Sequence, residues 1–510
     1  MMSLAVNTHS SLDDVLNSRY PFFLHLARDI HSIACHYQQR KKDLAVMDFD
    51  DLLINCLRLL REHPDILQSL SQQFLHVLVD EYQDTNILQA EIIDLLASGH
   101  RNLMVVGDDS QSIYSFRGAN FSNIIDFPKR YPDCKIFKLE TNYRSTPEIL
   151  NLANLSIENN ENQFPKALRA VRTAGTRPVL VSAENVMRQA EFVGQRINEL
   201  MRAGVPACDI AVLYRAHYHS MEVQMEFVRR DIPFEIRSGI RFFEQAHIKD
   251  VTAYMRVIAN GHDELAWRRL LLMYPKIGKV TFDKLWRRLS ASDQPLKLFL
   301  SDGYPETAPK SAQPGILACR RTWLKLLDLD LPDRTPDKII DVLLNKADYR
   351  DYLQDTYSDA AGREEDLIQL GSFASRFASL EDFLNELALL TNMSEAEELA
   401  ERDADKIVLS TIHQAKGLEW SHVFLIWCAD GMIPLKRALA DPDGEQEERR
   451  LFYVALTRAK DQLYLCTPCV DYNRSTGMLA LAPSRFIREL TPLSSKDEQR
   501  PFEQWTLFDT

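Results

Sequence analysis

The stretch from Phe74 to Asn86 constrains the fold of this 510-residue chain strongly, because an apolar run passes directly into two adjacent carboxylates. Residues 74–79 are mostly apolar, and Asp80 and Glu81 follow them. A short apolar run that ends in a turn signal is typical of a buried strand in a parallel sheet. The two acids would then stand at the carboxyl end of the strand, where open α/β sheets bind ligands. The ordinary alternative is a strand followed by a solvated acidic turn.

Apolar runs alternate with helical patterns along much of the chain. We expect strands at 74–80, 102–106, 135–139, 177–183, 209–215, 406–413, 422–429 and 462–467, and helices at 20–39, 86–97, 186–203, 446–460 and from Pro147 onward. Such alternation favours a parallel sheet with helical crossovers. Between residues 248 and 398 the strand signals fade and Leu-rich helical segments dominate. The sequence therefore predicts an α/β fold that is interrupted by a helical insertion.

Composition indicates an ordinary globular protein. The chain is 45% hydrophobic and 26% charged, with a formal net charge of −13. That charge does not favour nucleic acid as a partner, so a DNA site would have to be a local cleft. The eight cysteines are scattered, which suggests reduced thiols in the cytoplasm. The first residues do not resemble a signal peptide, and no apolar run approaches the ~20 residues of a membrane helix, so no membrane partner is expected.

Aromatic side chains follow the expected strand at 102–106. Tyr114 and Phe116 lie two residues apart, with Arg117 beside them. Aromatic rings of this kind can stack on single-stranded bases, each stack contributing roughly 1–3 kcal/mol, and an arginine can contact the backbone. The alternative is that both rings belong to a hydrophobic core.

Three further polar clusters also stand where strands or helices are expected to end. Gln111 could sense a γ-phosphate, Arg144 could bind phosphate, and Tyr143 could stack on a base. Residues 410–420 offer His413, Lys416 and Glu419, and the helix expected at 446–460 carries Arg458, as an arginine finger requires. Taken singly, these residues could equally be helix caps, surface ion pairs or a solvated turn.

In their order along the chain, these stretches resemble the motifs of the UvrD/PcrA/Rep group of superfamily 1 DNA helicases. VDEYQDTN (79–86) is similar to motif II, GDDSQSIYSFRGA (107–119) to motif III and TNYRS (141–145) to motif IV. TIHQAKGLEW (411–420) is similar to motif V and RRLFYVALTRAK (449–460) to motif VI. The resemblance extends from about residue 15 to residue 490 and joins the separate clusters into one pattern.

The resemblance implies an α/β architecture of two RecA-like domains of the P-loop NTPase type, the first incomplete, with a largely helical 2B insertion. The implied parts are a remnant of subdomain 1B (1–46), partial domain 1A (47–138), the first part of domain 2A (139–247), subdomain 2B (248–398), the second part of 2A (399–492) and a polar tail (493–510). ATP would bind in the cleft between 1A and 2A.

The resemblance also implies roles for individual residues, with ATP and Mg²⁺ as cofactors. Asp80 would hold Mg²⁺ and Glu81 would activate water, while Gln111, Arg144 and Arg458 would contact the γ-phosphate. Tyr143 would stack on adenine, and Glu419 and Gly417 would lie at the nucleotide. Tyr114, Phe116, Arg117 and His413 would meet single-stranded DNA. Lys276 and Lys279 lie in a looser match to a segment that contacts duplex junctions.

One part of the pattern is missing, because no G-x-x-x-x-G-K-[ST] phosphate loop occurs in the 510 residues. Such a loop supplies a lysine for the β/γ-phosphates and a hydroxyl for Mg²⁺. Three explanations are open: the chain is a fragment of a complete helicase, it is half of a split enzyme completed by a second chain, or it is a DNA-binding protein without ATPase activity. The implied function is accordingly an ATP-dependent 3′-5′ helicase acting in DNA repair, recombination or replication, or a non-catalytic single-stranded DNA-binding module.

The last residues carry a separate signal. Gln504, Leu507 and Phe508 have the spacing of the Q-x-x-L-F peptide with which bacterial replication and repair proteins bind the sliding clamp. We expect a disordered polar tail after Leu493 that presents this peptide. The alternative is that its aromatic side chains fold back onto the preceding domain.

Overall fold

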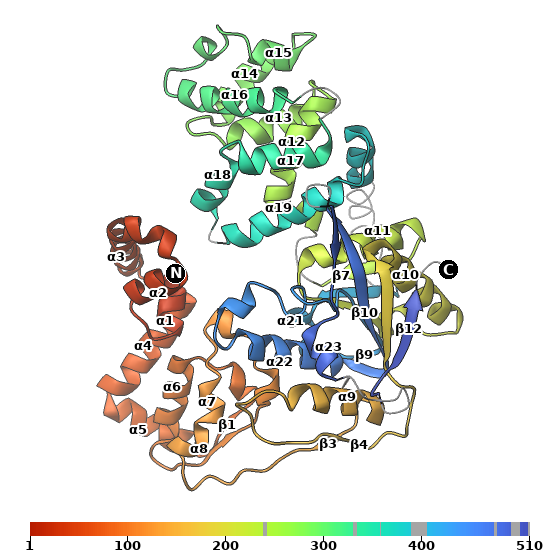
Figure 1. Ribbon diagram of the computed structural model, residues 1–510. Coiled ribbons are helices and arrows are strands. Elements are labelled where there is room, and N and C mark those ends of the chain that lie inside the picture. Colours follow the sequence, from red (N-terminus) through yellow and green to blue (C-terminus); the bar gives the residue numbers. More distant parts are fainter. Residues whose placement is uncertain are drawn as a thin grey trace.

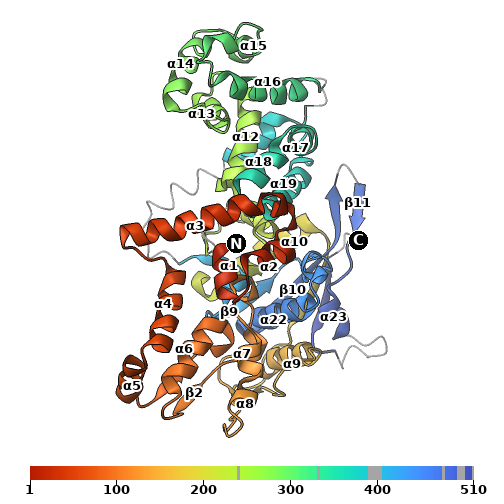
Figure 2. The ribbon, with the colours of Figure 1, turned by 90° about the vertical axis from the view of Figure 1, so that its left-hand side faces the viewer.

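The computed structural model describes residues 1–237, 242–329, 334–357, 359–388, 405–473, 477–490 and 500–507. Three bodies are evident in Figure 1: an N-terminal region of helices with a small sheet, a domain built on a large sheet, and a helical body above it. Figure 2 shows the long helix of the N-terminal region lying across the front of the molecule, below the helical body.

The large sheet has the strand order β12-β5-β10-β9-β6-β8-β7, and β11 pairs with β10 beside this path. Its strands are β5 (Val179–Asn185), β6 (Ile210–Tyr214), β7 (Phe234–Ile236), β8 (Ile407–Thr411), β9 (Trp420–Leu425), β10 (Ala459–Asn473), β11 (Gly477–Ala480) and β12 (Glu503–Leu507). Every neighbouring pair along the path is parallel, whereas β10 and β11 are antiparallel. The predicted parallel sheet is therefore confirmed.

Helices cover both faces of this sheet. One face packs on α10 (Val186–Arg202) and α11 (Met221–Arg229), and the other packs on α9 (Pro147–Ile157), α22 (Gly444–Leu456) and α23 (Arg485–Glu489). Helix α10 begins where the Asn185 side chain accepts a hydrogen bond from the Arg188 backbone N–H. Because both faces are covered, β6 is apolar and buried along its whole length.

The N-terminal region contains a second, much smaller parallel sheet. Strands β1 (Val77–Val79) and β2 (Leu103–Val105) pair in register, with Val77 opposite Leu103. Its helices are α1 (Met2–Asn7), α2 (Leu12–Arg19), α3 (Ala27–Leu44), α4 (Phe49–Glu62), α5 (Pro64–Gln73), α6 (Ile87–Ala97), α7 (Ser122–Ile125) and α8 (Phe127–Arg130). Leu78 is 73% exposed and Met104 57% exposed. One face of this small sheet is therefore open to solvent, unlike either face of the large sheet.

The strand expected at 135–139 is absent, and this prediction was wrong. These residues form no strand, and Phe137 and Leu139 are each more than 80% exposed. An isolated extended segment is not stable without a neighbour to pair with its backbone. The next pairing lies just beyond it, where β3 (Thr141–Asn142) and β4 (Arg169–Ala170) form a two-stranded parallel sheet.

The helical body occupies the expected insertion. Within the described part of 246–388 it contains α12 (Ala246–Ala259), α13 (Glu264–Leu272), α14 (Lys279–Leu289), α15 (Pro295–Phe299), α16 (Gln313–Leu327), α17 (Pro336–Asn345), α18 (Tyr349–Thr356) and α19 (Ala360–Ala374), and it has no strand there. Its core includes Trp267 and Trp323, both fully buried. Residues 389–398 of the predicted insertion lie outside the described residues.

The C-terminal tail is not wholly disordered, so that expectation was wrong for residues 503–507. They form β12, the outermost strand of the large sheet, which pairs in parallel with β5 from Val179 to Ala183. Trp505 and Leu507 pack on the core beside α10, while Gln504 and Thr506 are exposed. The tail therefore folds back onto the domain because alternate side chains bury apolar surface there. Phe508 lies outside the described residues.

Candidate nucleotide and DNA site

Asp80 and Glu81 follow β1 directly, at the carboxyl end of the small sheet. The Glu81 backbone N–H donates to Asp80 Oδ1 at 2.8 Å. Glu81 itself adopts a left-handed conformation with φ 49°, and its carboxylate accepts a hydrogen bond from Gln83 Nε2 at 2.5 Å. Such a backbone conformation is uncommon for a residue with a β-carbon and is frequent at functional sites. The turn thus presents two exposed carboxylates, one of them on a residue with an uncommon backbone conformation.

Lys416 connects this acidic turn to the large-sheet domain. It follows α21 (Ile412–Ala415), and its ammonium lies 2.6 Å from Asp84 Oδ2 and 3.4 Å from Glu81 Oε2. The same ammonium donates to the Gln111 carbonyl at 2.9 Å. Because the Lys416 side chain is only 7% exposed, water screens these contacts poorly. One buried cation therefore holds motifs II, III and V together.

Gln111 lies in the turn after β2, where its side chain donates to Asp108 Oδ2 at 2.7 Å. Asp108 also pairs with Lys166, whose ammonium lies 3.2 Å from Asp109 Oδ1. Burial raises the pKa of Asp109, while Lys166 opposes that shift. Sequence reasoning missed Lys166, because it stands in an irregular stretch with no recognisable motif.

Arg144 and Glu419 are brought together from opposite ends of the large-sheet domain. The Arg144 guanidinium pairs with Glu419 Oε2, and Lys460 Nζ lies 3.0 Å from Glu419 Oε1. The hydrogen bond from Lys460, and then that from Arg144, lowers the pKa of Glu419. Glu419 is therefore ionised between two cations. This geometry is consistent with the prediction that motifs IV, V and VI share one site.

Arg458 was expected on a helix, and this prediction was wrong. Helix α22 ends at Leu456, so Arg458 lies in the turn before β10. It is 2% exposed and donates to the Val454 carbonyl, the Leu418 carbonyl and Thr457 Oγ1 at 3.0 to 3.2 Å. Burial, and then the charge of Arg144, lowers its pKa to about 10. The helix ends early because the chain must enter β10 at Ala459.

Tyr143 precedes Arg144 in the chain, and Gly417 follows Lys416. Tyr143 is 76% exposed, so its ring is free to stack on a planar ligand. Gly417 has φ 85°, and a β-carbon there would meet no atom within 4 Å. Glycine is therefore favoured at 417 by its backbone conformation and not by crowding.

Four of the predicted DNA residues, Tyr114, Phe116, Arg117 and His413, form one cluster that spans the N-terminal region and the large-sheet domain. The ring centroids of Phe116 and His413 are 5.4 Å apart and nearly perpendicular, and Tyr114 donates its hydroxyl to the His413 carbonyl at 3.0 Å. The Arg117 guanidinium lies 5.4 Å from the centroids of both Tyr114 and Phe116. Phe116 is 58% exposed, so its ring remains available for stacking on a base.

His413 is neutral at physiological pH. Burial, followed by the charges of Arg215 and Arg117, lowers its pKa to about 3. Its ring therefore acts as an uncharged surface beside Phe116. The Lys416 ammonium lies 5.2 Å from the Tyr114 ring, so the acidic turn and the aromatic cluster meet at this lysine.

Lys276 and Lys279 are not brought to this site. Both are exposed; Lys279 is the first residue of α14 and Lys276 lies in the turn before it, in the helical body at the top of Figure 1. Gln504 and Leu507 lie on β12 at the outer edge of the large sheet, away from the N-terminal region in Figure 1. These residues belong to separate surfaces.

The residues described above supply part of what a Mg²⁺–nucleotide would need. Mg²⁺ is commonly held by one or two carboxylates together with phosphate oxygens and water, which suits Asp80. No cluster of three or more His, Cys, Asp or Glu side chains in metal-binding geometry occurs among the described residues. Arg144 and Arg458 suit phosphate oxygens. The lysine and backbone donors of a phosphate loop are missing from the sequence, so the residues fit one side of the nucleotide only.

Comparison with known families gives two matches that together cover most of the chain. The model of the UvrD/REP helicase N-terminal domain matches residues 16–132. The model of the UvrD-like helicase C-terminal domain matches residues 137–304 and 345–468. The interruption at 305–344 lies inside the helical body. The parallel sheets and the clustered motifs thus define a helicase-type α/β protein, and the chain belongs to the UvrD/Rep helicase family.

Individual relatives agree with that assignment. The chain is 33% identical to the ATP-dependent DNA helicase PcrA of Staphylococcus epidermidis strain RP62A, over 91% of this chain and 65% of the relative. It is 32% identical to PcrA of Staphylococcus aureus strain Mu50, with the same coverage. It is 33% identical to a probable DNA helicase II homolog of Rickettsia felis, over 89% of this chain and 70% of the relative. The chain therefore spans about two thirds of the length of these relatives.

No helix within the described ranges is both long enough and apolar enough to cross a membrane. The α/β fold class, with a helical insertion, agrees with the resemblance drawn from the motifs.

Proposed function

We propose that this chain forms the motif II-to-VI part of an ATP-dependent DNA helicase that translocates 3′ to 5′ on single-stranded DNA and acts in DNA repair, recombination or replication. In this proposal domains 1A (47–138) and 2A (139–247 and 399–492) form the cleft, and 2B (248–398) is the helical body. The relatives named above include ATP-dependent DNA helicases, which supports the activity.

The observation that carries the proposal is the position of Lys416. Its ammonium is 2.6 Å from Asp84 in the acidic turn and 5.2 Å from the Tyr114 ring in the aromatic cluster. A motor must couple the nucleotide cleft to the DNA surface, and a single buried side chain that contacts both is a direct means of coupling. Bound ATP would supply the free energy for movement.

Each remaining residue has a role in this proposal. Glu81 would orient and deprotonate the attacking water, and Asp80 would bind the metal through its carboxylate. Gln111, Arg144 and Arg458 would face the terminal phosphate, where guanidinium groups stabilise developing charge. Tyr143 would stack on the base, beside Gly417, and Glu419 would accept a hydrogen bond from the ribose. Tyr114, Phe116, Arg117 and His413 would line the path of the strand, and Lys276 and Lys279 would contact duplex ahead of it.

The test is an ATPase and unwinding assay with polarity controls. ATP hydrolysis stimulated by single-stranded DNA, together with unwinding of duplexes that carry a 3′ tail but not a 5′ tail, is the expected result for the complete enzyme. A Glu81→Gln variant should keep DNA binding and lose hydrolysis by at least 10²-fold. Unwinding from a 5′ tail would contradict the proposed polarity.

The second candidate function is a single-stranded DNA-binding module without ATPase activity. The observation that favours it is the lack of a phosphate loop in the 510 residues. Under this candidate the Glu81→Gln substitution has no effect on the rate of ATP hydrolysis, because the wild-type chain hydrolyses no ATP. DNA binding alone does not separate the two candidates, since both predict it.

We also propose that the C-terminal peptide binds the sliding clamp through Gln504, Leu507 and Phe508. Leu507 packs beside α10, so this docking requires β12 to leave the sheet. A clamp pull-down with wild-type chain and with the double substitution Leu507→Ala and Phe508→Ala tests the idea. Equal recovery of both chains would contradict it.

A further inference from the structure

The candidate DNA rings lie on a very short turn. Residues Ser115–Arg117 form a single 3₁₀ turn, and Tyr114 precedes it directly. The Arg117 N–H donates to the Tyr114 carbonyl at 3.0 Å, and the Gly118 N–H donates to the Ser115 carbonyl at 2.9 Å. A 3₁₀ turn of this length has few hydrogen bonds of its own and poorer bond geometry than an α-helix. Contacts with its surroundings therefore decide where its side chains point.

The two rings beside Ser115 are held differently. Tyr114 has a polar anchor, because its hydroxyl donates to the His413 carbonyl at 3.0 Å. Phe116 has no polar side-chain atom, and its ring centroid lies 5.4 Å from that of His413 and 6.1 Å from that of Tyr114. The Phe116 ring is also 58% exposed. Its position therefore depends on the backbone of the turn, and so on the group that holds Ser115.

Glu447 holds Ser115 from the large-sheet domain. The Ser115 hydroxyl donates to the Glu447 carboxylate, and its oxygen lies 2.6 Å from Oε1 and 2.5 Å from Oε2. A hydrogen bond to an ionised acceptor is stronger than one between neutral groups. Glu447 stands in the first turn of α22, whereas Ser115 belongs to the N-terminal region. One side chain therefore ties the turn with the rings to a different body of the protein.

The start of α22 is itself fixed closely in place. Gly444 packs so tightly that a β-carbon there would meet the Ala438 carbonyl oxygen at 1.8 Å. Glu448, which follows Glu447, pairs with Arg215 at 2.7 Å, and its side chain is only 4% exposed. The side chain of Glu447 therefore extends from a backbone that has little freedom to move.

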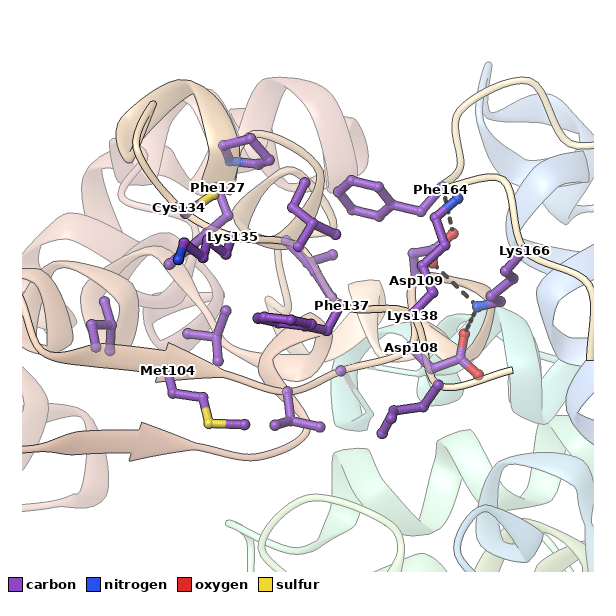
Figure 3. Close-up of a pocket in the computed structure, with 18 of the residues that line it drawn as sticks. Met104, Asp108, Asp109, Phe127, Cys134, Lys135, Phe137, Lys138, Phe164 and Lys166 are labelled. Carbon is purple, nitrogen blue, oxygen red and sulfur yellow. Dashed lines mark hydrogen bonds and ion pairs between the residues drawn. The ribbon is translucent and has the colours of Figure 1, made fainter. Parts of the chain in front are cut away.

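The large-sheet domain also holds the start of the loop that runs from β2 to this turn. Figure 3 shows Lys166 reaching Asp108 and Asp109, and its ammonium lies 3.2 Å from Asp109 Oδ1. Lys166 belongs to the segment before β4. These ion pairs fix the loop several residues before the rings, so they do not by themselves orient the turn at 115–117.

The middle of the same loop contacts α22. Arg450 Nε donates to the Ser112 carbonyl at 2.9 Å, and the Arg450 guanidinium lies 4.4 Å from the centroid of the Phe121 ring. Arg450 and Glu447 are three residues apart on the helix, so they lie on one face of it. That face of α22 therefore holds the loop at two points, and Glu447 is the one next to the rings.

We propose that Glu447 is a positioning residue for single-stranded DNA, which acts through Ser115 by holding the turn in which Phe116 presents its ring to a base. This role rests on the proposed function, because it takes Phe116 as a ring that stacks on DNA. Helix α22 ends two residues before Arg458. The helix that holds the DNA ring therefore also leads into a candidate phosphate-binding residue, and it forms a second link between the two sites besides Lys416.

The charge of Glu447 would have the opposite effect on DNA. A carboxylate beside the path of the strand repels phosphates, so its removal alone would strengthen binding. Glutamine at 447 has no charge, but its amide oxygen still accepts a hydrogen bond from Ser115. Under the proposal Glu447→Gln therefore keeps the affinity and Glu447→Ala loses it, whereas charge repulsion would make both variants bind more tightly.

The test measures the affinity of the full 510-residue chain for a fluorescein-labelled oligothymidylate by anisotropy. Glu447→Ala and Ser115→Ala should each weaken binding about fivefold, which corresponds to the loss of one hydrogen bond. The affinity falls because a smaller fraction of the molecules holds the turn in the arrangement that binds. The double substitution should bind no more weakly than either single substitution, because both remove the same hydrogen bond.

Glu445→Ala is the matched control. It removes an equal charge from the same turn of α22, but Glu445 pairs with Arg449 and Arg485 inside the large-sheet domain. We expect Glu445→Ala and Glu447→Gln to leave the affinity for the oligothymidylate unchanged within about twofold.

Two further measurements separate positioning from a general loss of stability. In a Phe116→Ala background, Glu447→Ala should change the affinity by less than about twofold, because the ring that it positions is gone. A general loss of stability would weaken binding equally in both backgrounds. In the chain without DNA, the amides of Arg117 and Gly118 should exchange hydrogen faster in Glu447→Ala, but not in Glu447→Gln or Glu445→Ala.

The outcomes distinguish this proposal from the proposed function. Unchanged or tighter binding by Glu447→Ala, an additive double substitution, or an equal loss in the Phe116→Ala background would overturn the role of Glu447. If Phe116→Ala itself weakens binding, the proposed function remains intact in those cases. Unchanged binding by Phe116→Ala, or no binding by the wild-type chain, would contradict the DNA site of the proposed function and the role of Glu447 together.

Discussion

The ammonium of Lys416 and the carboxylate of Asp84 lie 2.6 Å apart across the boundary between the large-sheet domain and the N-terminal region. Burial raises the pKa of Asp84, and the hydrogen bond from Lys416 counteracts that shift. The pair is therefore a buried ion pair in which each charge depends on the other. The pair joins the N-terminal region to the large-sheet domain. Among the described residues, few other ion pairs between these two bodies are as little exposed; one is the pair of Lys166 and Asp109.

Replacing Lys416 with Met should loosen the acidic turn. Removing one partner of a buried ion pair typically costs about 3 kcal/mol, because the other charge remains buried without compensation. We expect that decrease in the free energy of opening at residues 82–85, measured at pH 7.5 by native-state hydrogen exchange. Lys279→Met, at an exposed position in the helical body, is the matched control and should have no effect there. A decrease of less than about 1 kcal/mol would contradict the description of Lys416 and Asp84 as a buried ion pair.

The stability cost of Lys416→Met should depend on pH. Without Lys416 the pKa of Asp84 rises further, so the protonated carboxyl becomes the form that the folded protein prefers. A group with a raised pKa contributes stability below its unfolded value, and loses that contribution as pH rises through the folded value. The cost of Lys416→Met should therefore be smaller at pH 4.5 than at pH 7.5. An equal cost at both values would indicate a packing effect.

Substitution of Phe116 by Ala should weaken binding of single-stranded DNA by about 1–3 kcal/mol, or roughly 5- to 150-fold. The reason is the loss of an exposed ring held beside His413 at 5.4 Å. Phe116→Trp should retain binding, since indole stacks at least as well. Filter binding or anisotropy measures the effect, with Phe22→Ala as the control.

Arg117→Gln should make the binding of single-stranded DNA less sensitive to salt. If Arg117 contacts a phosphate, the slope of the logarithm of the binding constant against the logarithm of the salt concentration should become shallower by about 0.7.

His219 should make the large-sheet domain sensitive to acid. It is fully buried, stacks on Trp427 with centroids 5.2 Å apart, and burial lowers its pKa to about 3. A lowered pKa gives a contribution that is complete above the unfolded value near 6.5 and is lost as pH falls towards 3. Lowering the pH from 7.5 to 5 should therefore reduce the free energy of unfolding by about 2 kcal/mol through this residue. Urea unfolding of His219→Phe, which keeps a ring on Trp427, should show a smaller difference between those two pH values.

Trp505 should hold β12 on the sheet. Its ring contacts both Phe192 and Tyr464, with centroids 6.3 and 6.2 Å away, and Arg196 lies 5.9 Å from it. Because the ring is half-buried, Trp505→Ala should lower the free energy of strand opening by about 2 kcal/mol. Hydrogen exchange at 503–507 measures this, and Thr506→Ala, at an exposed position, is the control. If the clamp binds the tail, Trp505→Ala should strengthen that binding, since Trp505 is not one of the proposed anchors.

Much of the large-sheet domain could be predicted from the sequence. The apolar runs at 179–181 and 210–214 lie in the strands β5 and β6, because side chains that pack on helices at both faces of a sheet are mostly apolar. The helix at 186–202 shows helical spacing of apolar residues and begins at an asparagine cap. These are local signals. They predict β5, β6 and α10 well because the elements that pack against them are described within the large-sheet domain.

The predictions failed where a distant partner decides the outcome. Residues 135–139 have the composition of a strand, but β2 lies across an apolar slot and does not pair with them. Residues 503–507 read as a polar tail, yet the free edge of β5 provides the pairing that makes them a strand. Arg458 fits a helical pattern, but the start of β10 at Ala459 ends α22 before it.

The sequence by itself determined the family of this protein and indicated the candidate site residues, since acids, aromatics and arginines occur in a recognisable order and spacing. Only the tertiary structure decided which of these residues lie together. Lys416 meets Asp84 across more than 300 residues of chain, and Lys166 meets Asp108 from a stretch without a motif. The physical reason is that ion pairing and burial depend on distance in space, which side-chain identity and spacing along the chain do not specify.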